Sequence, residues 1–259
     1  MEVKMCTVIF AYKAHPEFDW ILVGNRDEFH HRPSASAHFW EEHPELLAGK
    51  DLEKGGTWTG ITKTGRFALL TNHRNPLLKV DTPLSRGFLT LDFLTHPSAQ
   101  LTAQEYATHL CKSKKAYEPY NLIVGDVQGL YYVNNITDTP MPIEPGVHGL
   151  SNALLNTPWP KVEKAKAKMN HLIEHFFTVS DLFEILDDHA PPEDDELPST
   201  GVSLETERLL STIHIESDHY GTQYKTVMLI DKNRLVRFYE RHKTKNGIWK
   251  THDFSFYVK

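Results

Sequence analysis

Short apolar, β-branched segments that come in pairs constrain the fold of this chain more than any other feature. CTVIFAYK (6–13) and WILVGN (20–25) flank the turn-prone AHPEFD, and TWTGIT (57–62) and RFALLTN (66–72) flank the glycine-containing KTG. Strands joined by such short connections pair with each other, so the pattern predicts antiparallel sheets. The same arrangement recurs in NLIVGD with LYYVNN and in YKTVMLID with RLVRFYER, before a last strand THDFSFYV.

Helical periodicity falls in separate blocks of the chain. The longest run, WPKVEKAKAKMNHLIEHFF (159–177), has Pro160 at a first-turn position and apolar residues three or four apart. These residues predict one buried face, consisting of Val162, Ala165, Met169, Leu172 and Phe176. Further helices are expected at 85–96, 101–115 and 179–190. Because strands and helices alternate in blocks, the predicted class is α+β, with two packed sheets covered by helices.

Length and composition argue against several classes of protein. A chain of 259 residues can form one large domain, so we expect a single domain over 1–259. A net charge of −6 without a basic stripe argues against nucleic acid as a partner. Two cysteines give no disulfide framework, which favours a reducing, cytoplasmic location. No signal peptide and no membrane span are expected, and the oligomeric state is left open.

The 16 histidines are scattered and follow no metal-binding motif. The sequence therefore predicts no metal site and no cofactor.

Polar residues gather at the ends of several predicted strands. In an antiparallel first hairpin, Cys6 falls opposite the stretch that contains Asn25, Arg26 and Asp27. Asn72 ends a strand of the second hairpin, and Asn152 ends the strand-like HGLSNALL. Strand ends commonly carry functional sites. A strand cysteine taken alone is more often a core residue, and NRDE taken alone is usually a solvated turn, so spacing leaves both interpretations open.

An ordered set of motifs extends over essentially the whole chain and reads CTV (6–8), GNRDE (24–28), RP (32–33), GGTW (55–58), LTN (70–72), SRG (85–87) and GLSNALLNTPWPK (149–161). This set resembles the NRDE family, which includes the animal transport and Golgi organisation protein 2. The resemblance implies an Ntn-hydrolase-like fold, a four-layer αββα sandwich of two antiparallel sheets, related to the choloylglycine hydrolase and penicillin V acylase group. This agrees with the α+β layering expected from the strand pattern.

The resemblance also implies roles for individual residues. Cys6 is implied as the nucleophile, Asp27 as the partner of its amine and Arg26 as the charge near the thiolate. Asn72 and Asn152 are implied as oxyanion donors. The residues expected to bind substrate are Asn25, Thr71, Ser151 and Gln223.

Two stretches depart from the family pattern. YGTQ (220–223) has Gln223 where an arginine often stands, with Lys225 as the nearest cation in sequence, and EPYNL (118–122) replaces the familiar NGFNL. A lysine lacks the planar fork of arginine, so it is an incomplete substitute.

An N-terminal cysteine supplies both a nucleophile and a base, because an α-amino group titrates at about 7.7–8.0 and a thiol at about 8.5. This chemistry requires that nothing precede Cys6. Residues 1–5 would then be an upstream start, with translation beginning at Met5 and that methionine removed, or a short pro-segment. We therefore expect a hydrolase of non-peptide amide (C–N) bonds that acts on a small-molecule acyl amide.

The alternative is a non-catalytic protein on the same fold. The resemblance implies links to haem trafficking and to lipid or acyl-coenzyme A metabolism, so haem or an acyl-coenzyme A-like ligand would be its partner. His30, His31 and His73 are the candidate haem ligands, because imidazole can ligate haem iron.

Overall fold

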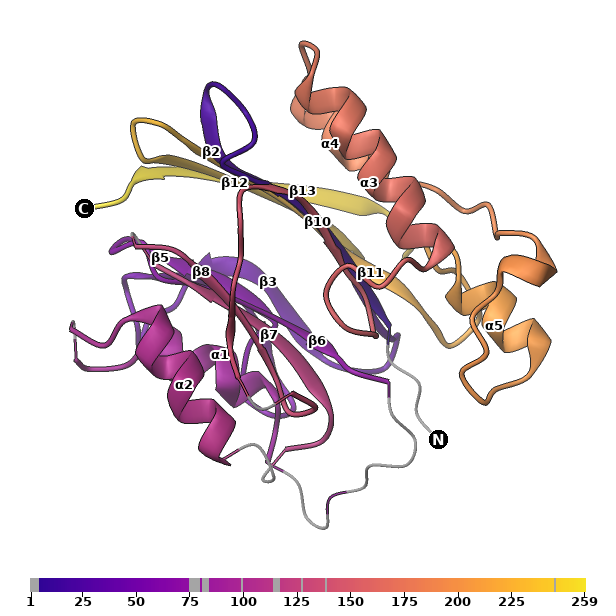
Figure 1. The fold of residues 1–259 in the computed structure, drawn as a ribbon, viewed down its shortest axis with the longest axis horizontal. Helices are drawn as coiled ribbons and strands as arrows, with labels where there is room; N and C mark the ends of the chain where they lie inside the picture. Colours follow the sequence, from indigo (N-terminus) through magenta and orange to yellow (C-terminus); the bar gives the residue numbers. More distant parts are fainter. Residues whose placement is uncertain are drawn as a thin grey trace. The chain divides into compact units, whose positions relative to one another are not determined.

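The computed structural model describes residues 5–74, 80, 84–98, 100–113, 117–126, 128–137, 139–244 and 246–259. The chain has two antiparallel sheets with a few helices, which confirms the predicted α+β class (Figure 1). It separates into two compact units, one with the bounds Met1–His31 and Pro145–Phe256 and the other with the bounds Arg32–Glu144 and Tyr257–Lys259. The expectation of a single domain over 1–259 stays a prediction.

The first unit is built on a six-stranded sheet with the order β10-β1-β2-β11-β12-β13. Its strands are β1 (Cys6–Tyr12), β2 (Phe18–Phe29), β10 (Gly146–Leu150), β11 (Tyr220–Asp231), β12 (Leu235–Lys243) and β13 (Trp249–Tyr257). β1 and β2 form the predicted first hairpin, in a register that pairs Cys6 with Arg26. β10 pairs with β1 and β11 pairs with β2, so segments from distant parts of the sequence flank this hairpin.

Two helices, α3 (Pro160–Ile173) and α4 (Val179–Ile185), pack on one face of this sheet (Figure 1). α3 begins at Pro160 as expected, and Thr178 caps α4 through a capping box. The core beneath them includes Ile9, Val23, Val227, Val162, Met169 and Phe183. A further short helix, α5 (Leu204–Leu210), and a 3-10 turn, η2 (Asp194–Glu196), precede β11.

The prediction of a buried helical face is wrong for one of its residues. Phe176 is 94% exposed, because α3 ends at Ile173 and the apolar periodicity continues past that end. Val162, Ala165 and Met169 are buried as expected.

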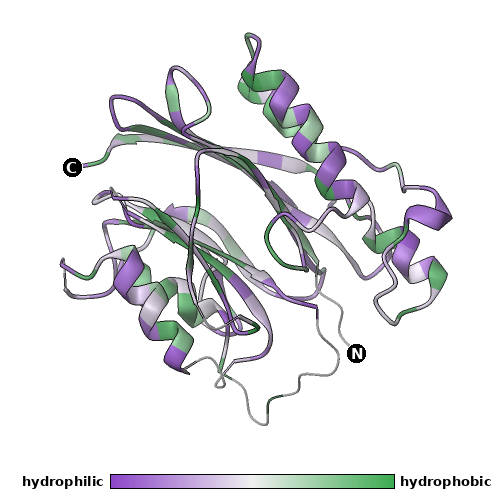
Figure 2. Cartoon of the chain, viewed as in Figure 1, coloured by the Kyte–Doolittle hydropathy of each residue, from purple (hydrophilic) through white to green (hydrophobic). Residues whose placement is uncertain are grey.

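The second unit contains a seven-stranded sheet with the order β3-β4-β5-β6-β7-β8-β9. Its strands are β3 (Ser34–Phe39), β4 (Leu46–Asp51), β5 (Thr59–Thr62), β6 (Phe67–Asn72), β7 (Tyr120–Gly125), β8 (Leu130–Asn134) and β9 (Met141–Pro142). The predicted hairpins β5–β6 and β7–β8 are confirmed. Helices α1 (Gly87–Leu94) and α2 (Ala103–Ser113) contribute to its core. Figure 2 shows hydrophobic and hydrophilic stripes along the helices, as expected for helices with one buried face.

The glycines of two family motifs meet in this second unit. A Cβ atom on Gly56 would lie 2.6 Å from the carbonyl carbon of Gly87, and the N–H of Thr57 donates to the Gly87 carbonyl oxygen at 3.3 Å. The GGTW and SRG motifs therefore make a close backbone contact at the start of α1, which only glycine permits.

Within the described part of the chain, none of the helices combines the length and the apolar character that crossing a membrane requires.

Candidate functional site

Cys6 is the first residue of β1 and is held from two neighbouring strands. It pairs with Arg26 of β2 in the antiparallel register. Its N–H donates to Asn152 Oδ1 at 3.1 Å, and Ser151 Oγ donates to its carbonyl oxygen at 2.8 Å. Ser151 and Asn152 follow β10 directly, so the pairing of β10 with β1 delivers them to this strand end. The structure brings Cys6, Arg26 and Asn152 together at one strand end, and their predicted roles stay proposals.

Asp27 is buried and only partly satisfied. Thr222 Oγ1 donates to Asp27 Oδ1 at 2.6 Å, while Oδ2 has no hydrogen-bond partner among the residues that the structure describes. Burial raises the pKa of Asp27 to about 7, against the opposing effects of the Thr222 hydrogen bond and of the charges of Lys161 and Lys225. A buried carboxylate oxygen without a partner is unfavourable, so this position is suited to one more donor or to a cation.

Cys6 is a protonated thiol at neutral pH in the chain that retains Met5. Burial raises the pKa of Cys6 to about 12, and the charge of Asp27 acts in the same direction. A hydrogen bond from the Asp27 backbone and the charge of Arg26 lower the pKa, but they are outweighed. Arg26 acts in the expected direction, because its charge lowers the pKa of Cys6, but burial and the charge of Asp27 outweigh it.

Alternation along β2 divides the NRDE motif between the two faces of the sheet. Arg26 and Glu28 share one face, where Arg26 Nη2 lies 3.4 Å from Glu28 Oε2. Asn25 and Asp27 share the other face, and Asn25 Nδ2 donates to the Ile213 carbonyl oxygen at 2.8 Å. Asn25 is buried, and its side-chain amide holds the segment that contains Ile213. The expected contact of Asn25 with substrate stays a prediction.

Tyr220 is a residue of this site that sequence reasoning missed. The N–H of Met5 donates to the Tyr220 hydroxyl at 2.5 Å, and this hydroxyl lies 3.2 Å from the Asp27 carbonyl oxygen and 3.4 Å from that of Met5. The buried Met5 side chain packs with Leu210, Ile215 and Tyr220. Tyr220 therefore contacts the residue whose carbonyl group is joined to the Cys6 nitrogen.

Comparison with known proteins establishes the family. The family model described as Transport and Golgi organisation 2 matches residues 5–245. The chain belongs to the Transport and Golgi organisation 2 family. The mouse Transport and Golgi organization 2 homolog is 30% identical over 280 residues, covering 97% of this chain and 99% of that protein, and the human homolog is 31% identical with the same coverage. The resemblance seen in the sequence motifs is confirmed.

A solved structure shows the same fold. The Caenorhabditis elegans N-acylethanolamine-hydrolyzing acid amidase ortholog superposes with a TM-score of 0.50 and 15% identity, covering 86% of this chain and 92% of that chain. At this identity the likeness shows the fold alone.

Gln223, the residue at which the resemblance implies a departure from the family pattern, lies at an irregularity in the strand pairing. The β2–β11 register shifts between Thr222 and Tyr224, and Gln223 Nε2 donates to the Gly221 carbonyl oxygen at 3.5 Å. Lys225, the nearest cation in sequence, is buried and forms an ion pair with Asp187. The YGTQ stretch does contribute to the site, but the residues of this stretch that contact Asp27 are Tyr220 and Thr222.

The remaining predicted residues of this Transport and Golgi organisation 2 family member stay proposals. Asn72 and Thr71 end β6 in the second unit, where Thr71 Oγ1 accepts a hydrogen bond from Asn121 Nδ2 at 3.1 Å. His30 and His31 are exposed after β2, and His73 follows β6, with its backbone N–H donating to the Pro119 carbonyl oxygen at 3.0 Å.

Proposed function

We propose that this protein, once Cys6 is its first residue, hydrolyses non-peptide amide (C–N) bonds of small acyl amides. The observation that carries the proposal is Asp27, a buried carboxylate with an unpartnered Oδ2 within the described structure, whose charge acts on Cys6. The Cys6 N–H already donates to Asn152 Oδ1. An α-ammonium group has three hydrogens, so it could keep this bond and also supply the donor that Asp27 lacks.

The proposed chemistry proceeds through a thioester. Cys6 Sγ attacks the amide carbonyl carbon, and the neutral α-amine accepts the thiol proton and donates it to the departing amine nitrogen. Water then loses a proton to the same amine and attacks the thioester, which releases a carboxylic acid and restores the thiol. Asn152 would stabilise the oxyanion, and removing one such donor commonly costs about 3–4 kcal/mol of barrier.

Met5 is incompatible with this chemistry while it is attached. An amide nitrogen at Cys6 cannot act as a base, and the thiol pKa of about 12 leaves almost no thiolate at neutral pH. Removal of Met5 would also vacate the space beside Leu210 and Ile215 and release the Tyr220 hydroxyl from the Met5 backbone. We propose that the acyl group of the substrate uses this space.

Cys6→Ala tests the proposal. Acyl p-nitroanilides of increasing chain length are incubated with the protein that begins at Cys6 and with the same protein carrying Cys6→Ala, and nitroaniline release is followed by absorbance. We expect the variant to release product at the buffer rate, because it lacks the attacking sulfur. Cys111→Ala is the matched control, since Cys111 lies on α2 in the second unit, and it should retain full activity. Equal release by the parent and by Cys6→Ala would remove the hydrolase proposal.

Binding without turnover is the second candidate function, and one observation favours it for the chain that retains Met5. In that chain the Cys6 nitrogen is an amide, and burial raises the pKa of the thiol to about 12, so neither an amine nor a thiolate is available at neutral pH. Titration with haem or a long-chain acyl-coenzyme A, followed by haem absorbance or tryptophan emission, would then give a saturable signal at micromolar protein.

A further inference from the structure

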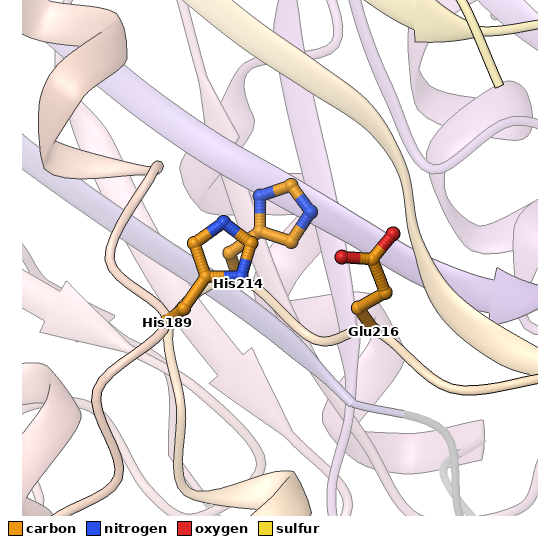
Figure 3. A group of neighbouring side chains, drawn as sticks. All are labelled: His189, His214 and Glu216. Carbon is orange, nitrogen blue, oxygen red and sulfur yellow. The ribbon is translucent and has the colours of Figure 1, made fainter.

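His189, His214 and Glu216 lie together, and none of them is among the predicted site residues. His189 follows α4, and the other two residues lie between α5 and β11. Each of the three offers one ligand atom, and these atoms all lie within 4.8 Å of one another. Figure 3 shows the two imidazole rings side by side, with the Glu216 carboxylate next to the His214 ring. No sequence motif marks the cluster, because its residues come from two segments that meet only in the folded chain.

His214 is the fixed member of the cluster. His214 is 5% exposed. Its backbone N–H donates to the Asp188 carbonyl oxygen at 2.8 Å, and its backbone carbonyl oxygen accepts a hydrogen bond from Thr212 Oγ1 at 2.8 Å. Its Nδ1 has no hydrogen-bond partner in the described part of the structure; Asp187 Oδ1 lies 3.8 Å away and is paired with Lys225. A buried imidazole that lacks a partner is unfavourable, and a bound metal ion would supply one.

The other two members of the cluster are exposed and can adjust. The His189 ring stacks on the His214 ring with 4.1 Å between centroids. A tetrahedral zinc ion with bonds of about 2.0–2.1 Å needs ligand atoms roughly 3.3 Å apart, which small rotations of exposed side chains can provide. Lys243 donates to Glu216 Oε1 at 2.8 Å. Such a surface ion pair is weak, so it can break when a metal binds, or it can stay intact while Oε2 binds the metal.

The donor set selects the class of ion. Two imidazoles and one carboxylate suit zinc and similar divalent transition metals, whereas calcium and magnesium prefer oxygen ligands alone. The charges of Lys225 and Lys243 are offset by those of Asp187 and Glu216, with which they pair.

We propose that His189, His214 and Glu216 bind a zinc-class divalent ion with three protein ligands. The ion would hold residues 213–216, a segment that is hydrogen-bonded to residues around the Cys6 site. Within this segment, the Ile213 carbonyl oxygen accepts a hydrogen bond from Asn25, and the Ile215 N–H donates to Thr222 Oγ1 at 3.0 Å. Thr222 in turn donates to Asp27. This role does not depend on whether the protein is a hydrolase.

Zinc affinity tests the site. The full chain is stripped with a chelator, and zinc binding is measured by competition with a chromophoric chelator. We expect one zinc ion per chain with micromolar or tighter affinity, and tetrahedral absorption bands when cobalt(II) replaces zinc. His189→Ala and Glu216→Gln change exposed side chains, so they should fold normally and lower the affinity at least tenfold. Cys6→Ala should bind zinc as the parent does, which separates this site from the thiol.

His171 and His175 provide the matched control. Their rings lie 4.5 Å apart, but His175 Nδ1 is hydrogen-bonded to the His171 carbonyl oxygen. The double variant His171→Ala/His175→Ala should bind zinc like the parent. The proposal is overturned if zinc does not bind stoichiometrically at micromolar protein. It is also overturned if His189→Ala and Glu216→Gln bind zinc as tightly as the parent.

Discussion

A single glycine placed before Cys6 is expected to lower kcat/KM for amide hydrolysis by at least about a hundredfold, since general base catalysis contributes about 10²–10⁴. The added residue converts the α-amine into an amide, which cannot accept the thiol proton. It leaves the sulfur, Ser151 and Asn152 in place. Both proteins would be released from the same fusion, and kcat/KM would be measured on one acyl amide at about pH 9, above the range in which α-amines usually titrate.

The control for this insertion is an extra glycine in the turn at Gly247, which is exposed and lies between β12 and β13. This protein should hydrolyse the amide as fast as the parent. If all three proteins are equally active, the α-amine of Cys6 is not the base, and the proposed mechanism is wrong.

Asp27→Asn is expected to change stability in a way that depends on whether the Cys6 amine is free. In the chain that retains Met5, burial raises the pKa of Asp27 from 3.8 to about 7. The folded chain then keeps a proton that the unfolded chain loses, so stability falls as pH rises from about 4 to about 7, by on the order of 4 kcal/mol. Asparagine cannot ionise, so the variant should be more stable than its parent at pH 8 and similar to it at pH 4.

The chain that begins at Cys6 should respond differently to the same substitution. There an α-ammonium faces the Asp27 carboxylate and lowers its pKa, so the stabilisation at pH 8 should disappear, and kcat/KM should fall at least about a hundredfold with the loss of the group that positions the amine. Denaturant unfolding of the four proteins at pH 4 and pH 8 gives the comparison. Equal stabilisation of both chains by Asp27→Asn would contradict the ammonium–carboxylate pair.

Asp188→Asn serves as a control of opposite sign. Hydrogen bonds from Lys164 and Lys168 outweigh its burial and lower the pKa of Asp188 to about 2. Its contribution to stability is present above the unfolded pKa and is lost at lower pH, so Asp188→Asn should destabilise both chains at pH 8.

The features that the sequence predicted correctly depend on local pairing. The β1–β2 hairpin has a short connection, so alternation and turn chemistry were enough to place Cys6 opposite the stretch that contains Asn25, Arg26 and Asp27. β3 was not predicted, because SASAHF contains no β-branched residue. Phe176 was placed in the core because periodicity does not show where a helix stops.

The features that the sequence did not predict depend on distant pairing. Thr222 reaches Asp27 from 195 residues away, and Tyr220 reaches Met5 from 215 residues away, both through the pairing of β11 with β2. The His189, His214 and Glu216 cluster likewise joins two segments on either side of α5. The resemblance supplied the proposed nucleophile Cys6 and the proposed partner of its amine, Asp27, but the residues that contact Asp27 were found only in the structure.

The most direct measurement is the intact mass of this protein when it is made from its own start codon. A working N-terminal nucleophile predicts a mass that corresponds to residues 6–259, with a free amine on Cys6. A mass that still includes Met5 would contradict amine-assisted catalysis by this chain.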